Sequence, residues 1–439
     1  MTFSKSIQYT LGILGIALLF FGFFTPKPIL QDINTIPTNS RVTVDQMIIM
    51  IVDGLRWDMV QPMPDRKTHF HNQLSRAFNY PDAKHFFLET GPPSSTKPRV
   101  RALTTGQPPS YIEIIKNFGN EAALSDSVIS SMHRNGKKKI LRGDYTWLNL
   151  FPDEFDEVHS SYGSDISDFY EIDNITLKNL DTDLIRDDWD FMVIHLLGFD
   201  HVSHYYEPDD VHSSIKLKQY EELLMDLFQW TKQASRSPDS PRVTKRRKMV
   251  MLMGDHGMDE EGNHGGGSYD EIMSSLLLVC PECDLSRLEE DTVLKQIDLP
   301  STIACLFNVS IPFSNTGVPF DMVDERCLSA VEIQRDTLRE KVGGSLPSDK
   351  NIYNITMISV GLSLLTISAV FANRGALFGI DLTMRNVVVL AANYGLMIAV
   401  ISDTFIEKEA KITRAVLPLT FLDSAYFFDP LCERCSCLS

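Results

Sequence analysis

Residues 47–54 read MIIMIVDG, an unbroken apolar run that ends in an aspartate and a glycine. A short run with no alternating polar residues is typical of a strand that is covered on both faces of a sheet. Similar runs recur along the chain, at 139–141, 191–197, 249–253 and 275–279. Residues 215–228 carry apolar side chains at roughly helical spacing. Short buried strands that alternate with helices predict an α/β fold with a mostly parallel sheet flanked by helices.

Acidic and imidazole side chains follow three of these predicted strands. They are Asp53 after the first run, Asp200, His201 and His204 in FMVIHLLGFDHVSH (191–204), and Asp255, His256 and His264 in MVMLMGDHGMDEEGNHG (249–265). Each alone has an ordinary explanation as a turn former, a cap or a core histidine. Because ligands collect outside the carboxyl ends of strands in open α/β sheets, we expect these side chains to meet at one edge. Together they offer enough oxygen and nitrogen ligands for two zinc ions.

The segment GPPSSTKPRVRALTTG, residues 91–106, places three hydroxyls before a predicted helix. Ser94, Ser95 and Thr96 precede Pro98, which suits the first turn of a helix. The pattern is compatible with an ordinary helix cap. A hydroxyl at that position also meets backbone N–H groups and the positive end of the helix dipole, and a bound cation would activate it as a nucleophile.

Apolar runs near both ends of the chain predict membrane segments, at 9–24, 353–372 and 386–402. The first suits a signal peptide core or an uncleaved anchor, and the absence of a small-x-small cleavage pattern after it favours the anchor. Basic residues flank these runs, namely Lys5, Arg374 and Arg385. The positive-inside rule places these in the cytosol and the region between the membrane segments in a lumen.

The predicted organisation therefore has four parts: a signal anchor or transmembrane helix within 1–30, a lumenal catalytic domain over 42–330, a linker over 331–350, and a membrane region of two or three helices over 351–439. Acceptor sequons for N-glycosylation occur at Asn174, Asn308 and Asn354. The stretch 231–248 reads as an exposed loop.

Composition limits the function classes. The chain has 439 residues, 43% of them hydrophobic, and a formal charge of −17. That charge argues against general nucleic-acid binding, since a phosphate backbone needs a basic surface. Seven cysteines are too few for a disulfide scaffold, and we expect Cys280 and Cys283 to form a local disulfide or remain two thiols.

In this combination the motifs resemble those of the GPI ethanolamine phosphate transferases, a family of the alkaline-phosphatase superfamily. The resemblance runs from about residue 47 to 320 and is carried by IVDGLRWD, PPSSTKPRVRALTTG, GDYTWLNLF, LGFDHVSH, GDHGMDEEGNHG and QIDLPSTIACLFNVSIPFSNTGVPF. Within the family, the segments STKPRVRALTTG, DSVISSMHRNGKKKILRGDYTW and IPFSNTGV are most similar to the member that modifies the second mannose.

The resemblance implies an alkaline-phosphatase-like fold and two zinc ions or similar divalent metals. It assigns one ion to Asp200, His204 and His264 and the other to Asp53, Thr96, Asp255 and His256. Thr96 would be the nucleophile, because relatives place it two residues before the proline. Asp144 and His201 are candidates for contacts with substrate.

The resemblance also implies the transfer of ethanolamine phosphate from phosphatidylethanolamine to a mannose of the GPI precursor. The enzyme would work in the endoplasmic reticulum membrane, with its catalytic domain in the lumen and a small membrane partner subunit. Family members usually carry more carboxyl-terminal membrane helices than we expect for this chain.

Two other functions remain compatible with the residues. A lumenal metal-dependent phosphodiesterase or nucleotide pyrophosphatase would use the same metals with water as the acceptor. A non-catalytic membrane scaffold would need no bound zinc. Product analysis and elemental analysis distinguish these hypotheses from the transferase.

Overall fold

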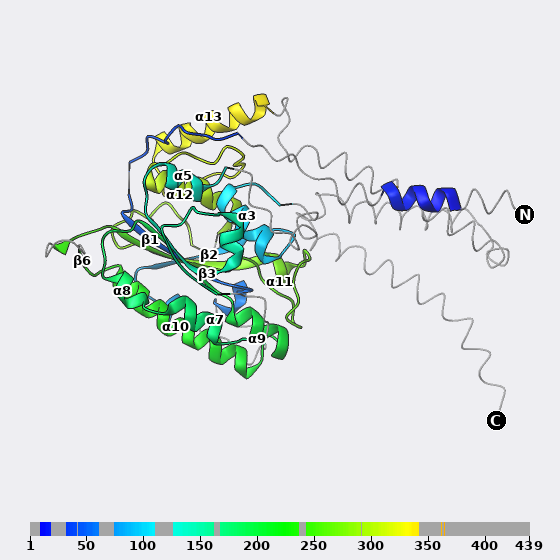
Figure 1. The fold of residues 1–439 in the computed structure, drawn as a ribbon, viewed down its shortest axis with the longest axis horizontal. Helices are drawn as coiled ribbons and strands as arrows, with labels where there is room; N and C mark the ends of the chain where they lie inside the picture. The colour runs from blue at the N-terminus through cyan, green and yellow to red at the C-terminus, as the bar shows by residue number, and fades with distance from the viewer. Residues whose placement is uncertain are drawn as a thin grey trace, which may run out of the picture. The chain divides into compact units, whose positions relative to one another are not determined.

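The computed structural model describes residues 9–18, 32–41, 43–60, 74–109, 126–161, 167–236, 243–290 and 292–341, together with 361 and 364. The chain divides into two compact units. One unit combines Met1–Thr25 with Ser345–Ser439, and the other is Pro26–Gly344. All candidate site residues lie in the second unit, which Figure 1 shows as a sheet between two layers of helices.

An eight-stranded sheet forms the centre of that unit, with the order β10-β2-β9-β8-β1-β5-β3-β4. The strands are β1 Gln46–Val52, β2 Ala83–Glu89, β3 Lys139–Asp144, β4 Glu157–Ser161, β5 Phe191–Leu196, β8 Lys248–Met253, β9 Met273–Val279 and β10 Val293–Lys295. Strands β6 Ser235–Arg236 and β7 Val243–Thr244 pair separately. Within the eight-stranded sheet, only β9 runs antiparallel to its neighbours. The predicted α/β fold with a mostly parallel sheet is confirmed.

Helices cover both faces of the sheet because both faces of its strands are apolar. In β1, Met47, Ile49 and Ile51 join one buried cluster, whereas alternate residues such as Ile48 and Met50 join the other. The first face packs against α3 Thr96–Thr105, α5 Val128–Arg134, α6 Tyr145–Leu150, α12 Leu299–Phe307 and α13 Glu325–Lys341. The second packs against α2 Ser75–Phe78, α8 Leu180–Leu184, α9 Gly198–Tyr206 and α10 Val211–Trp230. Shorter elements are η1 Trp57–Met59, α7 Glu171–Leu177, α11 Tyr269–Ile272 and η2 Gln296–Asp298.

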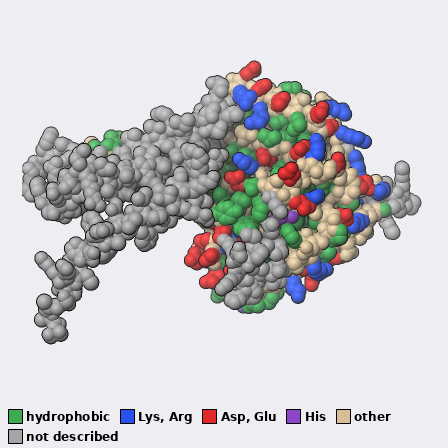
Figure 2. All heavy atoms as spheres, turned by 180° about the vertical axis from the view of Figure 1, so that it is seen from behind, with side chains coloured by type: hydrophobic (Ala, Val, Ile, Leu, Met, Phe, Trp, Pro, Cys, Tyr) green, Lys and Arg blue, Asp and Glu red, His purple; other side chains and the backbone are tan. Residues whose placement is uncertain are grey.

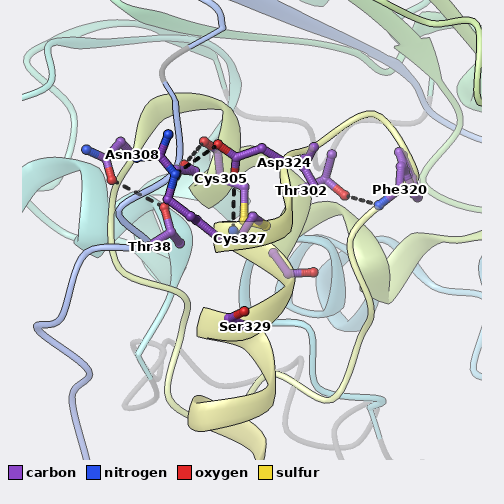
Figure 3. The surroundings of a disulfide bond; sticks show 12 residues. Thr38, Thr302, Cys305, Asn308, Phe320, Asp324, Cys327 and Ser329 are labelled. Carbon is purple, nitrogen blue, oxygen red and sulfur yellow. Dashed lines mark hydrogen bonds and ion pairs between the residues drawn. A yellow bond between two sulfur atoms is a disulfide. The ribbon is translucent and has the colours of Figure 1, made fainter.

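Helix α13 corrects the predicted linker over 331–350. The helix continues to Lys341, packs Cys327 and Val331 into the core cluster of this face, and also buries Leu338. A disulfide joins Cys327 to Cys305 of α12, as Figure 3 shows, and the Asp324 carboxylate accepts a hydrogen bond from the Cys327 N–H at 3.0 Å. The folded unit therefore extends into the segment that the sequence predicted to be a linker.

Two further sequence expectations are resolved by local contacts. Cys280 and Cys283 form a disulfide, which selects one of the two alternatives. The predicted exposed loop over 231–248 is wrong at its end, because Lys248 begins β8 and is buried. Just before it, Arg247 forms an ion pair with Asp45 at 2.8 Å. The carboxylate of Asp45 takes the place of the water that would surround Arg247 in an exposed loop.

Residues 9–18 form a helix inside the first predicted membrane segment. Within the described ranges, no helix has both the length and the apolar character needed to span a bilayer. The rest of the first predicted segment lies outside these ranges, as do the two later segments apart from residues 361 and 364.

Charged side chains are mixed on the surface. On the face shown in Figure 2, acidic and basic side chains are interspersed over the folded unit, and a group of acidic side chains lies at its lower edge.

Candidate active site

The candidate site forms at the carboxyl edge of three neighbouring parallel strands, β5, β1 and β8. Asp53 directly follows β1, Asp200 lies in the first turn of α9 after β5, and Asp255 follows β8. Gly54 makes the turn after Asp53 with a φ of +73°, and a Cβ there would come within 3.2 Å of the Asp200 carboxylate and 2.1 Å of Met258 Cε. Parallel strands in register thus bring together carboxylates that are far apart in sequence.

Asp53, Asp255 and His256 form what we call the inner group. Their ligand atoms all lie within 4.8 Å of one another, and all three residues are buried. His256 Nε2 is 3.3 Å from Asp53 Oδ1 and 3.4 Å from Asp255 Oδ2. Because His256 Nδ1 donates to the carbonyl oxygen of Gly257 at 2.9 Å, Nε2 is the nitrogen that can bind a cation.

Asp200, His204 and His264 form the outer group, whose ligand atoms also lie within 4.8 Å of one another. His204 and Asp200 are one turn apart on α9, and His204 Nε2 is 3.3 Å from Asp200 Oδ2. His264 Nε2 is 3.5 Å from Asp200 Oδ1 and 3.1 Å from His204 Nε2. His264 Nδ1 donates to the Ser94 carbonyl oxygen at 2.9 Å, so Nε2 again faces the group.

Of the three candidate hydroxyls, that of Thr96 contacts the inner group. Thr96 is the first residue of α3, and its Oγ1 donates to Asp53 Oδ2 at 3.3 Å and lies 3.5 Å from His256 Nε2. Ser94 is buried, and its Oγ donates to the Gly266 carbonyl oxygen at 3.0 Å. Ser95 is the N-cap of α3. Thr96 is therefore the one of these three residues whose hydroxyl contacts the inner group, whereas Ser94 supports the loop that carries His264.

Burial sets the electrostatics of the inner group. It raises the pKa of Asp53 well above its ordinary value, and neighbouring carboxylates, with Asp255 the strongest, raise it further. Burial also lowers the pKa of His256 to about 4. Without a cation, both effects favour uncharged side chains.

The outer group compensates its own charge. Burial alone would raise the pKa of Asp200, but the hydrogen bond with His204 and the charges of both outer histidines lower it to about 2. The same hydrogen bond raises the pKa of His204. The charges of Asp200 and the histidines thus stabilise each other.

The donor atoms of both groups fit divalent cations. In these two groups, the buried carboxylate oxygens without a hydrogen-bond partner among the described residues are Asp53 Oδ1, Asp200 Oδ1 and Asp255 Oδ2. In addition, His264 donates from Nδ1, so its Nε2, 3.1 Å from His204 Nε2, offers a lone pair to a cation. Mixed oxygen and imidazole donors of this kind suit zinc. That these residues bind zinc stays a prediction.

The remaining predicted site residues have mainly structural contacts. Asp144 caps α6, since its Oδ2 accepts from Thr146 N at 3.1 Å. His201 is buried, and its Nδ1 donates to the Asp168 carbonyl oxygen at 2.8 Å. Their contacts with substrate stay predictions.

The three sequons lie in different surroundings. Asn174 is exposed on α7, whereas Asn308 is half-buried at the end of α12. The sequon residue Ser310 is buried, with its hydroxyl 2.6 Å from that of Ser131. Asn354 lies outside the described residues. Glycosylation at these positions stays a prediction.

Sequence reasoning missed Glu271, which supports the loop before α11. Its carboxylate accepts from Gly266 N at 2.7 Å and Ser268 N at 2.9 Å, and Ser94 Oγ lies within 3.3 Å. The signal was present, because Ser268 and Glu271 have the spacing of a capping box.

A groove of about 540 Å³ lies between residues 33–39 and α13. None of its lining residues is a candidate site residue, and sequence reasoning gave no sign of it.

The first comparison is with models of protein families. A family model described as type I phosphodiesterase / nucleotide pyrophosphatase matches residues 128–279. This segment includes β5, β8 and most of the residues of both groups.

Curated relatives then define the family that the chain resembles. GPI ethanolamine phosphate transferase 2, catalytic subunit, of Homo sapiens is 29% identical over 72% of this chain. GPI ethanolamine phosphate transferase 2 of Yarrowia lipolytica is 30% identical over 71%, and GPI ethanolamine phosphate transferase 3 of Saccharomyces cerevisiae is 28% identical over 78%. The resemblance to the GPI ethanolamine phosphate transferases is confirmed. The chain covers 33%, 37% and 36% of the lengths of these relatives.

Solved structures with partial similarity include the lipooligosaccharide phosphoethanolamine transferase A of Neisseria meningitidis, 13% identical over 70% of this chain and 61% of that chain, with a TM-score of 0.44. Another is the periplasmic domain of EcEptC from Escherichia coli in complex with Zn, 13% identical over 67% of this chain and 90% of that chain, also with a TM-score of 0.44. Scores this low support no conclusion about this chain.

Proposed function

We propose that this chain transfers ethanolamine phosphate from phosphatidylethanolamine to the second mannose of a GPI precursor, through an intermediate on Thr96. The observation that supports this most is the position of the Thr96 hydroxyl at the N-terminus of α3, 3.3 Å from Asp53 in the inner group. The names of the curated relatives supply the substrate class.

The inner group with Thr96 would hold one zinc ion, and the outer group would hold the second. Bound there, the cations would act as Lewis acids that neutralise phosphoryl oxygens and favour ionisation of a hydroxyl. The backbone N–H groups at the start of α3 would bind phosphate oxygens, because the first turn of a helix has unpaired donors and a positive dipole.

The reaction proceeds by two displacements at phosphorus. Thr96 Oγ1 bonds to the phosphorus as the bond to the diacylglycerol oxygen breaks, and Asp53 is placed to accept the Thr96 proton. Diacylglycerol leaves with the proton that Asp53 accepted. A mannose hydroxyl then bonds to the phosphorus, the bond to Thr96 breaks, and the mannose proton returns to Thr96.

The test uses the full zinc-loaded chain and phosphatidylethanolamine labelled in its head group. We expect label on Thr96 first and on a GPI intermediate afterwards. Thr96→Ala should abolish transfer while zinc content stays largely unchanged, and Thr96→Ser, which retains a hydroxyl, is the matched control with partial activity. Near-normal transfer by Thr96→Ala would exclude Thr96 as the nucleophile.

Hydrolysis is the second candidate function, and the description of the matching family model favours it. The same residues would act with water in place of the mannose hydroxyl. Release of free labelled ethanolamine phosphate, with no label in the glycolipid even when the acceptor is present, would support this function. A chain without bound zinc would instead support a non-catalytic scaffold.

We further propose that the chain works in the endoplasmic reticulum membrane, with the unit Pro26–Gly344 in the lumen and a small membrane partner subunit. Exposed Asn174 provides a test of the lumenal side. Glycosidase treatment should shift the mobility of the wild-type chain on a gel, and Asn174→Gln should remove one part of that shift. An identical glycosidase shift in wild type and Asn174→Gln would contradict glycan attachment at this position.

A further inference from the structure

Trp147 and His195 form a buried polar contact behind the inner group. Trp147 comes from the GDYTW motif and lies on α6, and His195 lies on β5, the neighbour of β1. Trp147 Nε1 donates to His195 Nδ1 at 3.0 Å. The other imidazole nitrogen of His195, Nε2, is 3.6 Å from Asp53 Oδ2. A chain of polar groups thus leads from the core to a predicted metal ligand.

The Trp147 contact determines where the proton on His195 is. An indole N–H can only donate, so His195 Nδ1 must offer a lone pair. The proton of the neutral ring then lies on Nε2, the nitrogen nearer to Asp53. Trp147 therefore orients the His195 ring so that Nδ1 accepts from the indole and Nε2 faces Asp53.

The local sequence is built around this contact. Gly143, the first residue of the GDYTW motif, has no side chain, and a Cβ there would lie only 3.1 Å from His195 Cβ. Asp144 then caps α6, which places Trp147 in the first turn of that helix. Trp147 and His195 are both almost fully buried, and their rings meet edge to face at 85°. The motif thus provides room for the imidazole, a helix start and the indole donor.

His195 Nε2 has no hydrogen-bond partner within the described part of the chain. Its separation of 3.6 Å from Asp53 Oδ2 exceeds an ordinary hydrogen bond. In a buried site, however, an N–H dipole still attracts a carboxylate oxygen at this distance, because little water screens the interaction. An imidazole used only for packing would gain nothing from an unpaired donor, since burying one is costly.

We propose that His195, oriented by Trp147, is a positioning residue that holds the Asp53 carboxylate in the rotation it needs as a ligand of the inner group. This proposal rests on the proposed function for its metal chemistry. His195 neither binds the cation nor contacts the substrate in this proposal. It acts on the side of Asp53 that also accepts the Thr96 hydroxyl, at Oδ2.

The experiment compares His195→Leu, His195→Gln and Trp147→Phe in the full chain, with zinc affinity measured by chelator competition. His195→Leu removes the donor. We expect about a 10- to 100-fold weaker zinc affinity at the inner group, as is typical when a group that supports a metal ligand is lost. His195→Gln keeps an N–H donor and should recover most of the affinity. Trp147→Phe should fall between the wild type and His195→Leu.

A matched control is His85→Leu, which removes another buried imidazole from the same sheet, on β2. It should leave zinc affinity unchanged. With zinc saturating, we expect His195→Leu to lower kcat with little change in KM for the phosphatidylethanolamine donor.

Wild-type zinc affinity in His195→Leu would overturn the proposal, as would a loss in His195→Gln equal to that in His195→Leu. Wild-type protein that binds no zinc would overturn both this role and the metal site. Zinc binding without transfer would contradict only the proposed function, because the order of zinc affinities still tests His195.

Discussion

The inner group lies wholly inside the protein, whereas two of the three residues of the outer group reach solvent. The side chains of His204 and His264 are 28% and 16% exposed, while those of Asp255 and His256 are fully buried. The two groups share residue types and lie at the same edge of the sheet. Their surroundings, rather than their composition, distinguish them.

This difference in burial decides how each group manages charge without a metal. The outer group pairs one carboxylate with two partly exposed imidazoles, and the pKa of Asp200 falls to about 2. The inner group sets two carboxylates beside a histidine whose pKa is lowered to about 4 by burial. Without a cation, burial therefore favours uncharged side chains in the inner group, whereas the outer group compensates its own charge.

Loss of an inner ligand should have the largest effect on activity. We expect Asp255→Ala to lower the transfer rate by at least about a thousandfold, because the inner group contacts Thr96 and stabilises charge where the reaction occurs. His204→Ala should lower the transfer rate less, by about 10- to 100-fold, because water can replace a partly exposed ligand. Rates at saturating zinc provide the measurement. Equal losses in the two variants would show that burial does not separate the groups in function.

The ligand sets were accessible from the sequence because each candidate directly follows an apolar strand run or lies in a short motif after one. The depth of each group was not accessible, since it depends on which strands become neighbours. His195 illustrates the limit: it reads as one polar residue within a strand, and its meaning depends on Trp147, a residue from a different element.

The fold likewise contains elements that the sequence predicted and elements that only the packing explains. The apolar runs predicted the central strands, but β2 has mixed burial and β10 is largely exposed, so neither stood out. Helix α13 looked like a linker because it is mostly polar, with a narrow buried stripe that includes Val331 and Leu338. The partner of Cys327 was equally hidden, because only the packing of α12 against α13 brings Cys305 to it.

Removal of zinc should lower the stability of the folded chain. If zinc is present at about a thousand times its Kd, its loss costs about 4 kcal/mol in the free energy of unfolding. Asp255→Ala should lose most of this zinc-dependent stabilisation, and His204→Ala should retain a larger share. Thermal unfolding with and without a chelator measures both. A larger loss in His204→Ala would reverse the assigned order of the two groups.

In the zinc-free protein, neutralising one carboxylate from each group should have opposite effects. The folded pKa of Asp53 is raised above 3.8, so the folded state holds its proton more tightly and stability falls as pH rises through that range. Asp53→Asn should therefore stabilise the zinc-free chain at pH 7. The folded pKa of Asp200 is about 2, so Asp200 stabilises above pH 3.8 and loses this contribution as pH falls toward 2.

Asp200→Asn should accordingly destabilise the zinc-free chain at pH 7, by about 2 kcal/mol for a pKa difference of this size. Urea unfolding at pH 7 in the presence of a chelator gives both values. The difference between wild type and Asp200→Asn should shrink as the pH is lowered below 4. If Asp53→Asn and Asp200→Asn changed the free energy of unfolding in the same direction, the two groups would not differ in how they stabilise an ionised carboxylate.

The smallest expected effect concerns Ser94, which contacts His264 of the outer group and the loop that follows it. Its carbonyl oxygen accepts from His264, and its Oγ accepts from Gly265 N at 2.9 Å. Ser94→Ala keeps the carbonyl but removes the hydroxyl, so we expect a loss of about 1 kcal/mol in stability and a few-fold change in rate.

Ser95→Ala is the matched control, because Ser95 precedes the same helix and its side chain makes no capping hydrogen bond. Its effect on rate and stability should be smaller than that of Ser94→Ala. The zinc that Ser94→Ala releases first under chelator should be that of the outer group, since His264 is the ligand whose loop depends on Ser94. If Ser94→Ala instead abolished transfer as completely as Thr96→Ala, Thr96 would no longer be distinguished from Ser94 as the hydroxyl that acts with the inner group, and the functional separation of the two groups would fail.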